Sequence, residues 1–202
     1  KSISWMNNLN DWFWNKIGNS VKTPHPEKSL GIFRWLYGFY VLLFATPSYS
    51  WISDVPSGFY DPPLISIAWF FDTFPPSFFF DSIDVIVIIS IFFVMIGIKA
   101  RLFTIIFVLV NILGLNFSYS MGKIDHSFLE LVLLLCMIIA GWGSYYAILP
   151  DKEGKFESPD KALAILAVCI SFAMLSAGLP KLVFWIDFDL STNGFLSWYY
   201  GR

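Results

Sequence analysis

Residues 82–120 read SIDVIVIISIFFVMIGIKARLFTIIFVLVNILGLNFSYS, and this stretch decides the fold. It holds two apolar runs, residues 82–98 and 102–120, which are separated only by a short basic turn around Lys99 and Arg101. A helix needs about 20 mainly apolar residues to cross the hydrocarbon core of a bilayer. The stretch therefore predicts two membrane-spanning helices joined by a tight turn.

The composition of the whole chain agrees with a membrane protein. Of the 202 residues, 56% are hydrophobic and only 14% are charged, and the mean hydropathy is +0.64. Soluble domains usually carry about 25% charged residues. The 22 Phe, nine Trp and nine Tyr residues fit aromatic belts at both membrane interfaces. A net charge of -2 without a basic run gives no argument for nucleic acid, so the lipid bilayer is the partner that composition implies.

Three more apolar segments come near the length of a span. Together the segments predict an all-α integral membrane bundle of about five transmembrane helices, at residues 30–47, 82–98, 102–120, 127–149 and 161–179. A long outer loop, residues 48–81, follows the first helix. Its apolar piece at residues 64–71 is too short to cross a membrane, so we expect this piece to be interfacial or re-entrant.

The sequence divides into two predicted domains. Residues 1–28 form a cytoplasmic segment, which is either an amphipathic interfacial helix or a disordered tail. Residues 29–202 form the helical transmembrane domain. Both ends of the chain look cut or processed, and we expect the transmembrane domain to be incomplete at its C-terminus.

The distribution of charge predicts the orientation of the bundle. If five spans alternate, one side collects three basic clusters: Lys16, Lys22, Lys28 and Arg34; Lys99 and Arg101; and Lys152, Lys155 and Lys161. The other side carries Asp54, Asp61, Asp72, Asp81 and Asp84, with only Lys123 and Lys181 as basic residues. The positive-inside rule then predicts a cytoplasmic N-terminus. His126 and Lys181 are expected to face the periplasm, the lumen or the exterior.

His126 and Lys181 are the candidate catalytic residues, because both lie at the ends of apolar spans on the predicted outer side. Ionisable groups are costly next to lipid, so such groups often mark functional sites. A desolvated lysine loses its proton near neutral pH and can act as a base. The alternative for Lys181 is snorkelling to the interface. The alternative for His126 is the satisfaction of backbone groups at a helix start.

Four polar residues are expected to support this site. Glu130 lies four residues after His126, so at helical spacing the carboxylate shares a face with the imidazole and can orient it. Asp125 is adjacent to His126. Asn116 and Tyr119 belong to an unusually polar end of the third span.

Other ionisable groups and cysteines are assigned structural roles. Arg34 is a structural charge near the inner end of the first span, where it either snorkels to the cytoplasmic headgroups or has a partner within the bundle. Cys136 and Cys169 lie within apolar spans and are expected to be small buried hydrophobes.

No haem is expected, because one of the two histidines, His25, lies in the cytoplasmic segment. No metal is expected either, because no Cys/His cluster has zinc spacing.

Four short motifs, in this order, resemble those of the vitamin K-dependent γ-carboxylase family and its bacterial relatives with a horizontally transferred transmembrane domain. They are FRWLYG at residues 33–38, GIKAR at 97–101, DHSFL at 125–129 and SAGLPKL at 176–182. A weaker likeness is to the DoxX-like four-helix membrane proteins, which would also suit a role with quinones.

The resemblance implies that Lys181 is the base that deprotonates a vitamin K-type hydroquinone, with His126 as a nearby active-site group. The implied reaction is on the lumenal side, which agrees with the orientation predicted from charge. The sequence departs from the family where Pro180 precedes the lysine. The carboxylases also have further helices and a lumenal domain, so the resemblance does not extend to carboxylation of glutamate by these residues.

Two hypotheses about function are balanced. The first is a membrane enzyme that acts on a quinol, either carboxylase/epoxidase-like or an oxidoreductase. The second is a non-catalytic subunit that packs against the helices of other membrane subunits, with close contact at Gly31, Gly38, Gly141 or Gly143. A transporter or channel ranks below both, because the inner halves of the last two spans are almost wholly apolar.

Overall fold

The computed structural model describes residues 26–64, 66–121, 128–152 and 159–185, together with Asn8, Asp11, Trp12, Asn15 and Lys16. Within these residues the regular structure is helical, and the only strand-like pairing is an isolated parallel bridge between Ile98 and Leu149. The predicted all-α fold is therefore confirmed for the described part. Most of the predicted helix within residues 1–28 lies outside it.

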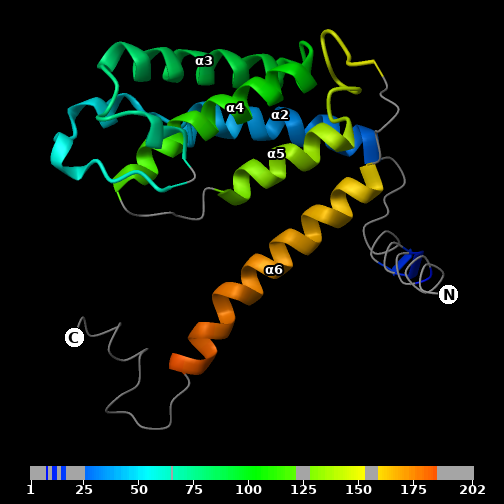
Figure 1. The fold of residues 1–202 in the computed structure, drawn as a ribbon. Helices are drawn as coiled ribbons and strands as arrows, with labels where there is room; N and C mark the ends of the chain where they lie inside the picture. The colour runs from blue at the N-terminus through cyan, green and yellow to red at the C-terminus, as the bar shows by residue number, and fades with distance from the viewer. Residues whose placement is uncertain are drawn as a thin grey trace. The chain divides into compact units, whose positions relative to one another are not determined.

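The described residues form five α-helices and four short 3-10 helices. The α-helices are α2 (Pro26–Phe44), α3 (Ser77–Ile96), α4 (Ala100–Ser118), α5 (Phe128–Ala140) and α6 (Pro159–Trp185). The 3-10 helices are η1 (Ser50–Asp54), η2 (Ser57–Phe59), η3 (Ile67–Phe70) and η4 (Tyr119–Met121). The chain divides into two compact units, Lys1–Ala164 and Ile165–Arg202. In the first unit α2, α3, α4 and α5 pack as a bundle and alternate in direction (Figure 1). The second unit contains the remainder of α6.

Three of the helices are long and apolar enough to cross a membrane: Ser77–Ile96, Ala100–Met121 and Pro159–Leu179. The predicted span 30–47 corresponds to α2, which carries Glu27, Lys28 and Arg34 and is therefore less apolar than the other three. The predicted span 127–149 is wrong in its second half, since α5 ends at Ala140. Gly141 has a φ of 72°, a left-handed conformation that ends a right-handed helix. Turns follow as far as Leu149.

A short turn joins α3 to α4 at one end of the bundle. At the turn end, where α3 and α5 finish and α2 and α4 begin, α3 ends at Ile96. The next residue, Gly97, has a φ of 76°, which lets the amides of Gly97 and Ile98 donate to the Phe93 carbonyl, both at 3.0 Å. The chain then enters α4, and the amide of Arg101 donates to Asp151 Oδ2 at 2.8 Å. Asp151 thus supplies an acceptor for the first turn of α4, where amides lack partners within the helix.

Small residues allow the first unit to pack closely. A Cβ at Gly38 would lie 2.5 Å from Met95 Cβ, so α2 and α3 can touch only because residue 38 is glycine. A Cβ at Gly31 would lie 2.7 Å from the carbonyl oxygen of Tyr145. Both glycines are therefore used for packing within the chain. This packing removes them as an argument for contact with another subunit.

At the loop end, where α2 and α4 finish and α3 and α5 begin, the α2–α3 loop (residues 45–76, described except for Ile65) is tied to the bundle. The carboxylate of Asp84 in α3 accepts hydrogen bonds from Ser48 Oγ at 3.0 Å and from the amides of Tyr49 and Ser50 at 2.7 and 3.0 Å. The amide of Ile67 donates to Asn116 Oδ1 in α4 at 2.9 Å. These contacts hold the loop over the ends of α3 and α4.

Candidate functional site

Glu130 is the acidic side chain in the first turn of α5. Its Oε1 atom accepts a hydrogen bond from the hydroxyl of Tyr37 in α2 at 2.6 Å, so the pair joins two helices that are 93 positions apart in the chain. A carboxylate inside an apolar bundle needs such a donor, because its desolvation is otherwise uncompensated. The structure therefore supplies the partner that the position of Glu130 required.

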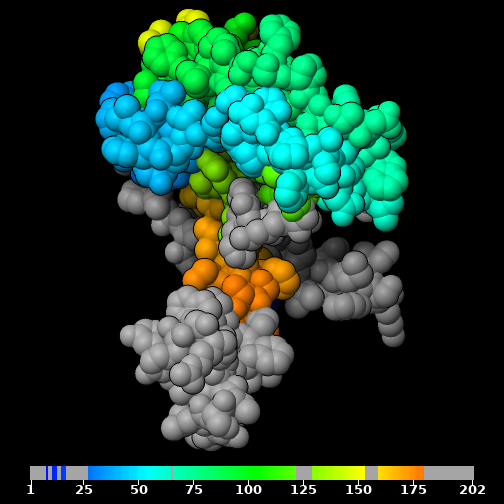
Figure 2. Space-filling model, turned by 90° about the vertical axis from the view of Figure 1, so that its left-hand side faces the viewer, coloured from blue at the N-terminus to red at the C-terminus, as the bar shows by residue number. Residues whose placement is uncertain are grey.

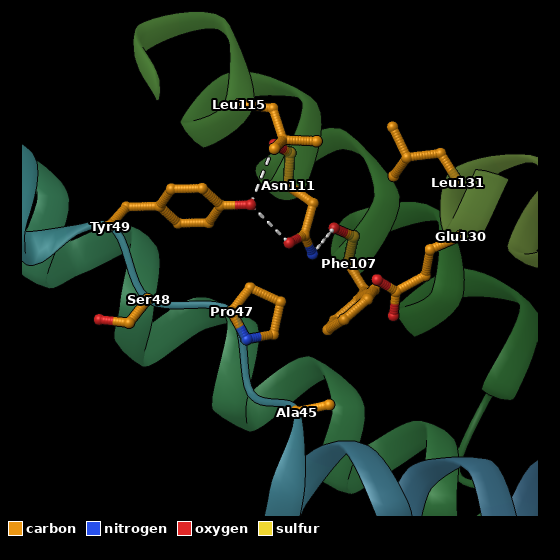
Figure 3. A pocket seen from close by; sticks show the side chains of 9 residues that line it. All are labelled: Ala45, Pro47, Ser48, Tyr49, Phe107, Asn111, Leu115, Glu130 and Leu131. Atoms are coloured by element: carbon orange, nitrogen blue, oxygen red, sulfur yellow. Dashed lines mark hydrogen bonds between the residues drawn. The ribbon is translucent and has the colours of Figure 1, made fainter. Parts of the chain in front are cut away.

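Glu130 lines a pocket of about 280 Å³ at the loop end of the bundle. The pocket is bounded by the chain after α2, by α4 and by α5, and its lining residues are Ala45, Pro47, Ser48, Tyr49, Phe107, Asn111, Leu115, Glu130 and Leu131. In Figure 3 the carboxylate of Glu130 projects from α5 towards Pro47 and Phe107. An apolar cavity with a few directed polar groups is the usual form of a small-molecule site.

A second polar group lies on the other wall of the pocket. The hydroxyl of Tyr49 donates to Asn111 Oδ1 at 2.8 Å, and Asn111 Nδ2 donates to the Phe107 carbonyl at 2.8 Å (Figure 3). The ring of Tyr49 fits against Gly114, where a Cβ would lie 2.6 Å from the ring atoms. Asn111 is thus oriented on both sides of its amide, and its neighbour Tyr49 is fixed in place.

Arg34 occupies the interior of the bundle towards the turn end. Its side chain is fully buried and donates to five backbone carbonyls: Val94 and Met95 in α3, and Trp142, Tyr145 and Tyr146 after α5, at 2.6 to 3.1 Å. The carbonyls at the C-terminus of a helix carry partial negative charge and favour a cation. Snorkelling was therefore the wrong alternative for Arg34, and the partner within the bundle is the backbone itself.

Aromatic rings fill the bundle next to Arg34 and Tyr37. The ring of Tyr37 lies 5.8 Å from that of Trp142 and 6.1 Å from that of Phe33. Trp142 is buried, and its indole Nε1 donates to Thr104 Oγ1 at 3.2 Å. Tyr37 is therefore held by these rings while its hydroxyl reaches Glu130.

The structure describes only some of the predicted site residues. His126 and Asp125 lie outside the described residues, so the predicted pairing of His126 with Glu130 lies outside them too. Lys181 lies in α6, but its side chain is likewise outside the described part. Asn116 and Tyr119 are at the loop end but do not line the pocket. Asn116 instead holds the α2–α3 loop, and the buried Tyr119 hydroxyl has no hydrogen-bond partner among the described residues.

Sequence reasoning missed Tyr37 and Tyr49. Tyr37 lies three residues after Arg34, which places both on one face of α2, and this spacing was a usable signal. Tyr49 lies in a loop, where no periodicity indicates the direction of the side chain.

Within the described residues no group of three or more His, Cys, Asp or Glu side chains is arranged to hold a metal ion. Cys136 is buried, as expected from the sequence, whereas Cys169 is only half-buried, so the expectation was wrong for Cys169.

Comparisons with protein-family models, with curated proteins and with solved structures gave no match to this chain. The resemblance to the vitamin K-dependent carboxylases therefore rests on the four sequence motifs alone.

Proposed function

We propose that the protein is a multi-pass integral membrane protein that binds a quinol in the Glu130 pocket and removes a proton from it on the non-cytoplasmic side. The observation that carries the proposal is the Glu130 carboxylate, held by the Tyr37 hydroxyl at 2.6 Å within a mostly apolar pocket. Such a carboxylate can accept a hydrogen bond from a ligand hydroxyl through its remaining lone pairs.

The pocket supports a ring compound with a hydroxyl group. Its walls are mainly the side chains of Pro47, Phe107, Leu115 and Leu131, which favour an aromatic ring over a sugar or a nucleotide. A volume of about 280 Å³ lies near the low end of ordinary ligand sites, roughly 300–1,000 Å³. One ring system therefore fits, while a long isoprenoid tail remains outside the pocket.

The chemical step is a proton transfer from a quinol hydroxyl to a base. The resemblance assigns the base to Lys181: its neutral amine takes the proton and becomes an ammonium, and the ligand becomes a quinolate. His126 is the neighbouring group by the same resemblance. These two roles rest on the sequence alone, whereas the role of Glu130 as hydrogen-bond acceptor rests on its position in the pocket.

The orientation belongs to the same proposal. Lys28, Lys99, Arg101 and Lys152 lie towards the turn end of the first unit, and Asp54, Asp61, Asp72, Asp81 and Asp84 lie towards the loop end. By the positive-inside rule the turn end faces the cytoplasm. The pocket then opens on the periplasmic or lumenal half of the bundle.

The test is chemical labelling of Lys181 in native membranes with an amine reagent applied from the outer side, read by mass spectrometry. Labelling near neutral pH that is suppressed by menaquinone or a vitamin K analogue is the expected result. The Glu130→Gln variant should bind menaquinone more weakly, while the matched control Asp81→Asn, an exposed carboxylate at the start of α3, should bind it as the unaltered protein does. Labelling only at high pH without protection, together with partner chains that co-purify in fixed ratio, would favour the non-catalytic subunit.

A further inference from the structure

The α2–α3 loop has two faces of different character. One face packs into the bundle through the buried side chains of Tyr49, Ile52 and Ala68. The other face exposes large apolar side chains: Trp51, Phe59, Leu64, Ile67, Trp69 and Phe70. The exposed fraction is 86% for Phe70 and 77% for Leu64. Exposure of apolar surface to water costs about 25 cal/mol of free energy per Å². An ordered surface with this many exposed apolar side chains therefore indicates a non-aqueous partner.

The exposure follows from an ordered structure. The hydroxyl of Tyr60 donates to the Ala68 carbonyl at 2.5 Å, and burial raises the pKa of Tyr60, as does the nearby Asp72 carboxylate, so the donor proton is retained. The ring of Phe71 packs edge-on against Phe117 of α4 at 5.3 Å. Together with the bonds from Asp84 and Asn116, these contacts fix Trp69 and Phe70 outward. Figure 2 shows residues of this loop as a continuous cyan and blue-green surface.

The charge of the loop restricts the partner. Residues 35–98 contain no Lys, Arg or His, and Asp54, Asp61, Asp72 and Asp81 are exposed. Anionic lipids are recognised by clusters of Lys and Arg, which this surface lacks. Tryptophan at the level of the headgroups is the usual anchor of a protein in a lipid interface. The chemistry therefore matches lipid without net charge.

The anchoring of the loop sets its depth. Asp84 is near the start of α3 and Asn116 is near the end of α4, and both helices are long and apolar enough to span a membrane. The loop is thus held at the level where these helices leave the hydrocarbon core. Irregular backbone exposed to lipid is not tolerated deeper than this, because its polar groups would lack partners.

We infer that residues 50–64 and 66–71 form a platform that lies in the headgroup region of the leaflet at the loop end, with Trp51, Trp69 and Phe70 inserted among zwitterionic lipids. Of the two sequence-based alternatives for residues 64–71, this favours the interfacial one over a re-entrant segment. Pro47, Ser48 and Tyr49 line the pocket and lead directly into η1, so the platform also sets the pocket close to lipid. The inference does not depend on the quinol.

The test uses nitroxide labels in phosphatidylcholine vesicles, on a Cys136→Ala, Cys169→Ala background. Labels at Leu64→Cys and Phe70→Cys should be more accessible to oxygen than to a water-soluble nickel chelate, and Asp54→Cys should show the reverse. Replacing a third of the lipid with phosphatidylglycerol should not increase the depth of the labels. Preferential access of the nickel chelate to residues 64 and 70 would place the platform in water, and protection from both reagents would mean that protein covers it. Either result overturns the inference.

A second measurement needs no cysteine background. Brominated phosphatidylcholine should quench part of the tryptophan fluorescence of the natural sequence, and Trp69→Phe should remove a share of the quenched signal. Quenching that is unchanged in Trp69→Phe and in Trp51→Phe would contradict the inference independently of any failure of the labelled variants to fold. If Trp69→Phe reduces the quenching but menaquinone does not protect Lys181, the lipid-bound platform would stand while the proposed quinol enzyme would fail.

Discussion

At the scale of single residues, Arg34 fixes the turn end by binding five carbonyls from two separate segments. We predict that Arg34→Met lowers the stability in detergent by about 3 kcal/mol or more, because several buried carbonyls lose a charged donor. Arg34→Lys should recover only part of this loss, since one ammonium cannot reach the same acceptors. Thermal unfolding measures both variants. The matched control is Lys28→Met at an exposed position of α2, and equal melting temperatures for all three variants would refute the role of Arg34.

The Glu130–Tyr37 pair supplies the second prediction at this scale. Tyr37→Phe removes the hydroxyl that holds the carboxylate, so a quinone analogue should bind about tenfold more weakly, the equivalent of roughly 1.4 kcal/mol. Tyr40→Phe changes an exposed tyrosine of the same helix and should leave the affinity unchanged. Titration of purified protein with the analogue measures both. Equal affinities of the two variants for the analogue would show that Glu130 does not take part in binding it.

Residue types alone identified Glu130 as a carboxylate that needs a partner, but they did not identify the partner. Tyr37 lies 93 positions away, and a contact of that separation depends on how the helices pack. The same holds for Arg34, whose acceptors are backbone carbonyls that carry no signal in the sequence. Polar residues inside spans can thus be recognised from the sequence, whereas their partners require the fold.

At the scale of helices, hydrophobicity predicted the number of α-helices among the described residues between 26 and 185, and it located the start of each helix within about five residues. It failed where apolar residues serve packing. Residues 141–149 are mostly apolar, yet they run beside the α3–α4 turn, and the amide of Leu149 donates to the Gly97 carbonyl at 3.1 Å. The nearby pair Gly141 and Gly143 was the available signal that α5 ends early.

Contact between α2 and α3 yields a prediction in which packing opposes helix propensity. Gly38→Ala should gain about 1 kcal/mol from propensity, but its Cβ would collide with Met95, so we expect a net loss of about 1–3 kcal/mol. Gly178→Ala in α6 meets no atom within 4 Å and should be neutral or stabilising. Thermal unfolding again decides the sign. A stabilised Gly38→Ala protein would show that α2 and α3 are not in close contact.

The attachment of the α2–α3 loop through Asp84 gives a further prediction. Asp84→Ala removes the acceptor of two loop amides, so hydrogen exchange at Tyr49 and Ser50 should become faster while exchange in the middle of α4 stays slow. Asp81→Asn is the control, because Asp81 is exposed. Exchange that is unchanged in Asp84→Ala would mean that other contacts hold the loop.

At the scale of the whole molecule, the charges and the pocket are arranged consistently along the first unit. Lys28, Lys99, Arg101 and Lys152 lie towards the turn end, and Asp54, Asp61, Asp72, Asp81 and Asp84 lie towards the loop end, where the pocket also lies. The charge asymmetry was predictable from the sequence because alternating spans sort loops onto two sides. The pocket was not predictable, because it arises where the chain after α2 meets α4 and α5 side by side.

The central claim is that a quinol binds in the Glu130 pocket. Photolabelling of native membranes with a photoreactive naphthoquinone, followed by mass-spectrometric mapping, tests this claim most directly. Labels are predicted on residues 45–49, 107–115 and 130–131, and an excess of menaquinone should suppress them. Labels confined to exposed apolar side chains outside the pocket, such as Phe92 and Val85, or labels that menaquinone does not suppress, would contradict the claim.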